Sequence, residues 1–337
     1  MRQHHTGNSD AYKAAAIGAG LFLRGDRGRI VVSGADRATY LQGMLTNDVA
    51  GLHAGQGCYA AYLTAQGRMI ADLWVYELGD AMLLSLSLDV KDTVLAKLDQ
   101  FVFSEDVQLG DVSETSVSVA VVGPDAGSRI QRALDADDSS RAAATLPEHG
   151  NVRASFAGEP VIVLCVTDTG LPGYELVIDR QRVAALLAAL RGADVVDLDG
   201  TDAETFRIEA GVPKFHQDMD EETIPLEAGI EDRAISLTKG CYVGQEVIIR
   251  VLHRGHGRVA EKLVGLIFDG GDAPAAKSIV RAGGRDVGRV TSSTWSPRLD
   301  RPIALAYLQR DFIAPGTHVT VGESPATVSP LPFSRVT

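Results

Sequence analysis

The chain has 337 residues, which is long enough for two or three compact units with substantial cores. Hydrophobic residues make up 45% and charged residues 23%, a balance that excludes wholesale disorder and a bundle of membrane helices. The formal net charge of −12 opposes non-specific binding to duplex nucleic acid, so we do not expect nucleic acid as a primary partner.

Three cysteines, Cys58, Cys165 and Cys241, stand far apart in the sequence and form no Cys-x-x-Cys pair. This spacing argues against a disulfide framework, a structural zinc site and a four-thiolate cluster. No segment has the pattern of a signal peptide, and the apolar runs are shorter than the ~20 residues of a spanning helix. We therefore expect a reduced, cytoplasmic protein with no metal site and no membrane partner.

The first part of the chain reads as a mixed α+β layer. Turn signals at Gly67 and Gly79 separate three apolar runs and predict a meander, and Asp36 is the expected cap of the helix before it. In chain order we expect strand, helix, three strands, helix and strand at residues 29–32, 36–45, 59–64, 69–77, 81–86, 90–101 and 107–109.

The second part of the chain again alternates predicted strands and helices, and the last part contains predicted strands only. We expect strand, helix, exposed charged loop, two strands and helix at residues 117–122, 124–134, 135–141, 161–166, 174–178 and 179–191. This order resembles a split βαβ arrangement. The last quarter predicts a small barrel or sandwich from strands at 263–268, 287–292, 303–308 and 318–321.

The most informative segment is the octapeptide of residues 239–246, Lys-Gly-Cys-Tyr-Val-Gly-Gln-Glu. Residues 243–252 can be helical, so Cys241 would lie at or just before a helix N-terminus. The helix dipole and nearby Lys239 both favour a thiolate there, as a nucleophile requires. The alternative is a buried cysteine, which Cys58 and Cys165 fit better because they lie inside apolar β runs.

This octapeptide resembles the K-G-C-Y-x-G-Q-E signature of YgfZ-type folate-binding proteins, relatives of the glycine-cleavage T-protein. Residues 207–213 and 224–229 look like the R-x-E-A-G and P-x-E segments of the wider superfamily. Residues 34–48 resemble its first folate-domain segment, and residues 288–297 resemble its terminal barrel.

The resemblance implies an α+β fold of two interleaved folate-binding subdomains, residues 1–258, with a C-terminal antiparallel β-barrel, residues 259–337, in a three-part ring. It implies a tetrahydrofolate-binding accessory protein that supports iron–sulfur cluster assembly or repair, with Cys241 and Lys239 as the working groups. Iron–sulfur client or assembly proteins would be its partners. The alternative is a folate-dependent aminomethyltransferase or demethylase of the T-protein type.

One departure argues against that alternative. T-proteins carry a G-G-x-x-D-D stretch, whereas residues 67–72 retain only the second carboxylate, Asp72, beside Ala71. Strand alternation places Asp72 on one face with Ile70 and Trp74, so it is the expected acceptor for the N–H edge of a pterin. A solvent-facing strand aspartate is the alternative.

The other expected folate contacts lie in the later motifs. They are Arg207, Glu209, Tyr242, Gln245, Glu246 and Arg254. For Arg207 and Glu209, a structural ion pair that stabilises a turn fits the sequence as well as a contact to folate does. Arg254 belongs to a basic cluster with Arg250 and Arg258 that would receive the acidic tail of folate or an acidic partner, or would simply be a solvated helix end.

Overall fold

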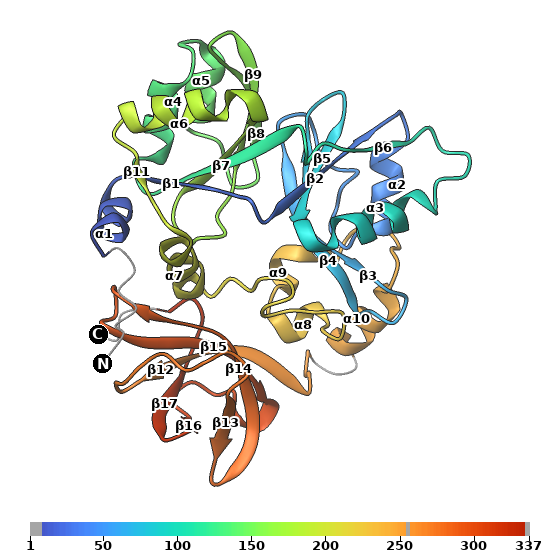
Figure 1. Cartoon of the computed structure of the whole chain (residues 1–337). Coiled ribbons are helices and arrows are strands. Elements are labelled where there is room, and N and C mark those ends of the chain that lie inside the picture. Colours follow the sequence, from blue (N-terminus) through green and yellow to red (C-terminus); the bar gives the residue numbers. More distant parts are fainter. Residues whose placement is uncertain (1–8, 254–256, 334–337) are drawn as a thin grey trace.

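The computed structural model describes residues 9–253 and 257–333. Within them lie two open sheets and one closed barrel, each with its own hydrophobic cluster, grouped around α7 (Gly200–Ala210) (Figure 1). The predicted fold class, mixed α+β with a terminal antiparallel barrel, is confirmed.

A five-stranded antiparallel sheet contains the predicted meander. Its strand order is β3-β4-β5-β2-β6, and its apolar side chains pack against helices α2 and α3. The elements are β2 (Arg27–Ser33), α2 (Arg37–Met44), β3 (Gly57–Leu63), β4 (Met69–Glu77), β5 (Met82–Ser87), α3 (Lys91–Asp99) and β6 (Gln108–Asp111).

A six-stranded sheet, ordered β11-β1-β7-β10-β9-β8, forms the second unit, with α4, α5 and α6 packed on it (Figure 1). Strand β1 of this sheet precedes the five-stranded sheet in the sequence, and the other strands of the six-stranded sheet follow it. The two units are therefore interleaved along the chain. The elements are α1 (Ser9–Ile17), β1 (Gly20–Leu23), β7 (Ser116–Val122), α4 (Ala126–Ala133), α5 (Asp138–Ala143), β8 (Asn151–Phe156), β9 (Glu159–Cys165), β10 (Gly173–Asp179), α6 (Val183–Gly192) and β11 (Val196–Asp197).

Helix α7 links the sheets to the barrel. Its N-terminus is capped by Asp199, which accepts hydrogen bonds of 2.8 Å from the amides of Thr201 and Asp202, and it ends at Gly211 with φ of 69°. The chain then returns to the five-stranded sheet through α8 (Pro225–Ala228), α9 (Glu231–Ala234) and α10 (Gln245–His253). No helix in the described ranges is long and apolar enough to cross a membrane.

The C-terminal unit is a barrel with strand order β12-β15-β14-β13-β16-β17. Closure pairs β12 with β17, which leaves no open sheet edge. The strands are β12 (Glu261–Phe268), β13 (Ile279–Ala282), β14 (Arg285–Ser296), β15 (Arg301–Gln309), β16 (His318–Val321) and β17 (Ser324–Ser329). The sequence predicted four of these strands and missed β13 and β17.

Two local predictions are wrong. The expected loop at 135–141 contains the start of α5, because Asp137 accepts a 2.7 Å hydrogen bond from the Ser140 amide and caps a helix there. Asp36 lies at the start of α2 but makes no capping hydrogen bond. Its carboxylate instead accepts a 2.8 Å bond from the Asp106 amide, tying α2 to the segment before β6.

Candidate functional site

A cavity of about 250 Å³ lies between the two sheets, beside α7. Six separate stretches of chain line it: the segment from the end of β1 to the start of β2, β4, the end of β5, the β9–β10 loop, α7, and the segment after α7. The lining residues that carry charge are Arg24, Asp26, Arg27, Asp72, Asp168, Glu204, Arg207 and Lys214.

Asp72 forms one wall of the cavity. It is 5% exposed, and its Oδ2 accepts a 2.9 Å hydrogen bond from the hydroxyl of Tyr59 on the neighbouring strand. No other residue of the described chain donates to Oδ1, and the side chain borders the cavity. Burial raises the pKa of Asp72, although Arg27 and the Tyr59 hydroxyl oppose the shift. The alternative of a solvent-facing aspartate is wrong.

Trp74 and Arg27 continue this wall. The guanidinium carbon of Arg27 lies 4.3 Å from the centre of the Trp74 ring, and Arg27 also donates a 2.9 Å bond to the carbonyl of Ser85. The indole Nε1 of Trp74 is buried and has no hydrogen-bond partner among the residues that the structure describes. The wall therefore combines a mostly buried indole, covered by the Arg27 guanidinium, with a carboxylate acceptor.

Ala71 faces away from the cavity. It is 0% exposed and lies in the hydrophobic cluster of the five-stranded sheet, whereas its neighbour Asp72 borders the cavity. Strand alternation explains the difference. A carboxylate at position 71 would point into an apolar core, so its absence removes no group from the cavity wall.

Arg24 holds the opposite wall. Its Nη1 lies 2.7 Å from Asp168 and 3.0 Å from Glu175, and its Nε lies 3.3 Å from Asp26. Burial alone would lower the pKa of Arg24, but these carboxylates outweigh it and raise the pKa. Two buried atoms beside this group, Glu175 Oε2 and Thr169 Oγ1, have no hydrogen-bond partner in the described chain. Glu175 lies on β10, as the sequence suggested.

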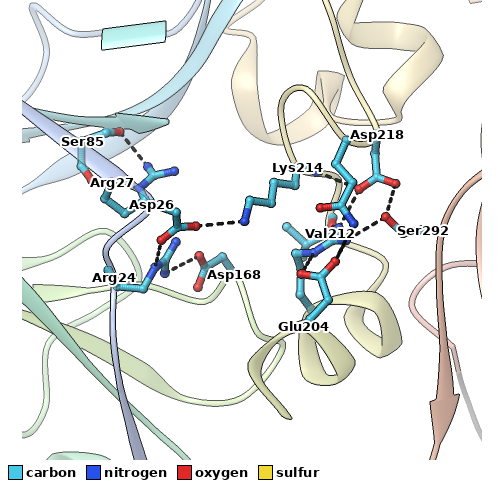
Figure 2. A network of polar contacts seen from close by, with 12 residues as sticks. Arg24, Asp26, Arg27, Ser85, Asp168, Glu204, Val212, Lys214, Asp218 and Ser292 are labelled. Atoms are coloured by element: carbon cyan, nitrogen blue, oxygen red, sulfur yellow. Dashed lines mark hydrogen bonds and ion pairs between the residues drawn. The ribbon is translucent and has the colours of Figure 1, made fainter. Parts of the chain in front are cut away.

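The segment after α7 reaches across to the β1–β2 connection through Lys214. Figure 2 shows its side chain extending toward Asp26, and the two charged atoms are 3.1 Å apart. This ion pair joins residues that are far apart in sequence. It closes one side of the cavity.

Arg207 lines the cavity and braces α7 at the same time. Its guanidinium lies 2.7 Å from Asp218 and also binds Glu204, and Ser292 of the barrel accepts a 2.9 Å hydrogen bond from it. Asp218 is 3% exposed and accepts a further 2.6 Å bond from Ser292. The network fixes α7 to the barrel.

Glu209 points away from the cavity. Its Oε2 accepts a 2.6 Å hydrogen bond from the hydroxyl of Tyr12, and Ser296 donates to Oε1. Arg298 lies 3.6 Å from the same carboxylate. Glu209 thus joins α1 and the barrel to α7, and Arg207 and Glu209 do not pair with each other.

The octapeptide lies at a different place, against α2 and the turn between β3 and β4. Lys239 Nζ donates bonds of 2.6 to 2.7 Å to the carbonyls of Gln42, Leu45 and Asn47, where α2 ends. Burial lowers the pKa of Lys239 to about 8. Tyr242 is buried in the adjoining core, with Lys239 Nζ 5.2 Å from its ring.

The remaining octapeptide residues are more exposed. Cys241 is exposed and precedes α10, whereas Cys58 and Cys165 are buried, as expected from their apolar strands. In the first turn of α10, Gln245 is half-buried and Glu246 is exposed. None of the octapeptide residues lines the cavity in the described chain. Arg254 lies outside the described residues.

Of the expected folate contacts, the structure therefore brings Asp72 and Arg207 to one cavity. Sequence reasoning missed Arg24, Asp26, Arg27, Asp168 and Lys214, which come from three separate stretches. The signal available was the charged run around Gly25 between two apolar strands. Among the residues of 9–253 and 257–333, no group of three or more His, Cys, Asp or Glu side chains is arranged to hold a metal ion.

Comparison with known families matches almost the whole chain. Residues 2–239 match the GCVT N-terminal domain, and residues 261–334 match the glycine cleavage T-protein C-terminal barrel domain.

Curated relatives agree in name and length. An aminomethyltransferase of Rubrobacter xylanophilus is 31% identical over 99% of this chain and 88% of its own length. Those of Thermus thermophilus and Geobacillus kaustophilus are 31% and 32% identical and cover 98% and 97% of this chain. For these two relatives, the alignment spans at least 90% of the relative's own length.

Among solved structures, the glycine cleavage system aminomethyltransferase T from Bartonella henselae superposes with a TM-score of 0.85 at 23% identity. The superposition covers 96% of this chain and 89% of that one. At this identity the likeness establishes the shared fold.

Proposed function

Because the chain belongs to the glycine cleavage T-protein family, we propose that it transfers an aminomethyl carbon to tetrahydrofolate and that the cavity holds the pterin ring of that folate. The observation that carries the proposal is Asp72, a buried carboxylate that lines the cavity and whose Oδ2 accepts a hydrogen bond from Tyr59.

The family assignment corrects the first functional expectation, an accessory role in iron–sulfur cluster assembly with iron–sulfur client proteins. Relatives aligned over nearly the whole chain carry the name aminomethyltransferase, which supports the alternative instead. The octapeptide of residues 239–246 resembles the YgfZ-type proteins in this one motif alone. The proposed activity does not depend on it, since this segment lies away from the cavity.

The chemistry of the cavity suits a pterin. Proteins of this family use tetrahydrofolate, whose pterin is flat and presents adjacent N–H donors along one edge. Asp72 Oδ1 is an acceptor for that edge, and the Trp74 ring offers an apolar surface beside it. A cavity of about 250 Å³ is smaller than the ~300–1,000 Å³ of sites for whole drug-sized ligands. The aminobenzoyl-glutamate portion would therefore extend outside.

The opposite wall supplies further polar groups. Glu175 Oε2 and Thr169 Oγ1 are buried and have no partner within residues 9–253 and 257–333, and such groups are costly unless a ligand or water satisfies them. Arg24 forms ion pairs with the neighbouring carboxylates of Asp168 and Glu175. Thr169 lines the cavity and would hold a polar edge of the substrate, whereas Glu175 lies outside the lining and pairs with Arg24.

The reaction needs no oxidant or reductant. A carrier thioether, R–S–CH₂–NH₃⁺, gives its CH₂ carbon to N5 and N10 of tetrahydrofolate. The C–S and C–N bonds break, two C–N bonds form, and the two folate N–H protons leave with the thiol and the ammonium ion. Within this scheme Asp72 binds and orients the pterin so that its nitrogens face the incoming carbon.

The test mixes the protein with an aminomethylated lipoyl carrier and tetrahydrofolate, and measures ammonium and methylene-tetrahydrofolate together. We expect equal amounts of both, at turnover near or above ~1 s⁻¹, the range of ordinary enzymes, and no ammonium when folate is omitted. The proposed activity would be overturned if folded protein formed neither product. It would also be overturned if ammonium were released at the same rate with and without tetrahydrofolate.

A further inference from the structure

The segment of residues 211–219, which we call the strap, runs from the end of α7 along one side of the cavity. Its residues Val212, Pro213, Lys214 and Phe215 line the cavity. The carbonyl of Lys214 accepts hydrogen bonds from three later amides of the strap, so the strap is a compact loop. At its far end, Asp218 is fixed to Arg207 and to the barrel. Movement of the strap would therefore reshape the cavity wall.

Two side chains attach the strap to the five-stranded sheet. Lys214 Nζ lies 3.1 Å from Asp26, and His216 Nδ1 lies 2.5 Å from Asp89. These carboxylates flank the same end of the sheet, because Arg27 of β2 pairs with Ser87 of β5 and the Leu88 amide donates a 2.8 Å bond to the carbonyl of Asp26. The strap is thus held to one sheet end at two adjacent points.

His216 has a second carboxylate partner and an unusual backbone. Its Nε2 lies 3.0 Å from Glu221, so both ring nitrogens face carboxylates. Both nitrogens must carry protons to donate in both directions, which only the imidazolium can do. Its φ is 62°, a left-handed conformation that favours glycine, so the contacts of the side chain offset backbone strain at this position.

We propose that His216 is a positioning residue for the cavity wall: when doubly protonated it latches the strap to Asp89, and when it loses a proton the strap loosens and the cavity opens to ligand exchange. Nothing in the family assignment concerns this residue. The latch concerns the free protein, and only its effect on folate exchange rests on the proposed function.

The sign of the pH effect follows from the groups around His216. Asp89 and Glu221 face its ring; on the adjoining elements, Lys214 pairs with Asp26, Glu204 with Arg207, and Asp220 with the Thr223 hydroxyl. Burial alone would lower the pKa of His216, but hydrogen bonds to Glu221 and Asp89 and their charges raise it above the usual 6.5. The latch is therefore complete below pH 6.5 and is lost as the pH rises through the raised pKa.

Hydrogen–deuterium exchange of the full-length free protein tests the latch without any ligand. After correction for intrinsic rates, we expect strap amides to exchange roughly two- to fivefold more slowly at pH 6 than at pH 9, the change that a half-exposed ion pair produces. His216→Asn, which tolerates the left-handed backbone, should exchange fast at both pH values. His216→Lys, which keeps a positive charge, should exchange slowly at both. His318→Asn, an exposed barrel histidine, is the matched control and should behave as wild type.

Asp89→Asn provides a second variant that leaves the strained residue unchanged, and it should also remove the pH dependence. Equal strap exchange at pH 6 and pH 9 in wild type, or an unchanged pH dependence in folded His216→Asn or Asp89→Asn, would overturn the latch. Stopped-flow release of tetrahydrofolate should be slower at pH 6 than at pH 9 by the same factor. If the protein binds no folate, the proposed function fails while the exchange result still decides the latch.

Discussion

The hydroxyl of Tyr59 donates a 2.9 Å hydrogen bond to Oδ2 of Asp72, and both residues are almost fully buried. This bond stabilises the ionised carboxylate of a residue that lines the cavity. Removing the donor should raise the pKa of Asp72 further, since the Tyr59 hydrogen bond acts to lower it.

We therefore expect Tyr59→Phe to weaken tetrahydrofolate binding by about 0.5–1.5 kcal/mol. The loss should be larger at pH 6 than at pH 8, because a carboxyl with a raised pKa is protonated first as the pH falls. Tyr62→Phe, which alters a buried tyrosine of the same strand, is the control. Titration calorimetry at both pH values decides the matter, and identical affinities for Tyr59→Phe and wild type would exclude this role.

Lys239 is a structural clamp at the end of α2. Its ammonium satisfies three backbone carbonyls, so Lys239→Met should lower the free energy of unfolding by roughly 2–4 kcal/mol. Lys262→Met, which removes only a half-exposed ion pair with Glu231, should cost at most about 1 kcal/mol. Urea denaturation measures both changes, and equal losses would contradict the clamp.

The buried pair of Arg207 and Asp218 fixes α7 to the barrel. Asp218→Ala removes one of the two carboxylates that pair with the buried guanidinium and the acceptor of the Thr291 and Ser292 hydroxyls, and it should cost about 3–5 kcal/mol of stability. Asp286→Ala breaks the exposed pair with Arg281 in the barrel and should cost at most about 1 kcal/mol. Thermal unfolding of the two variants measures both losses of stability. A mild effect of Asp218→Ala would show that the network is dispensable.

The three cysteines should differ in reactivity. Cys241 is exposed, whereas burial raises the pKa of Cys58 to about 12 and also raises that of Cys165. Iodoacetamide at pH 7.5 should label Cys241 first, and Cys241→Ser should remain unlabelled until unfolded. Because Cys241 lies away from the cavity, the variant should keep its folate affinity. Earlier labelling of Cys58 would contradict the burial.

Most of the fold could be predicted because the residue composition of most strands is typical of β structure. β4 and β7 are long, β-branched or apolar runs with clear turn signals on both sides. Two of the segments that were missed lack such a signal: β13 has only four residues, with Val280 alone fully buried, and α5 depends on the cap from Asp137. Local pattern does not reveal elements that tertiary pairing or a single cap stabilises.

For the site, alternation along β4 placed Asp72 beside Trp74 correctly, but the other charged residues could not be joined without the fold. Arg24, Asp168 and Lys214 meet only because the two sheets are interleaved around α7. The octapeptide misled for a physical reason. A side chain at Gly244, with φ of 84°, would lie 2.5 Å from the Thr64 carbonyl, so this glycine is required by close packing rather than by a ligand.

The central claim is that Asp72 binds the pterin of tetrahydrofolate. Anaerobic titration calorimetry of the wild-type protein with tetrahydrofolate at pH 7.5 should show saturable 1:1 binding, and Asp72→Asn should weaken it by about 1–3 kcal/mol, or roughly 5- to 150-fold. Asp125→Asn, at the start of α4 and outside the cavity, should bind as wild type does. Wild-type affinity in a folded Asp72→Asn variant, or no binding by the wild-type protein, would contradict the account.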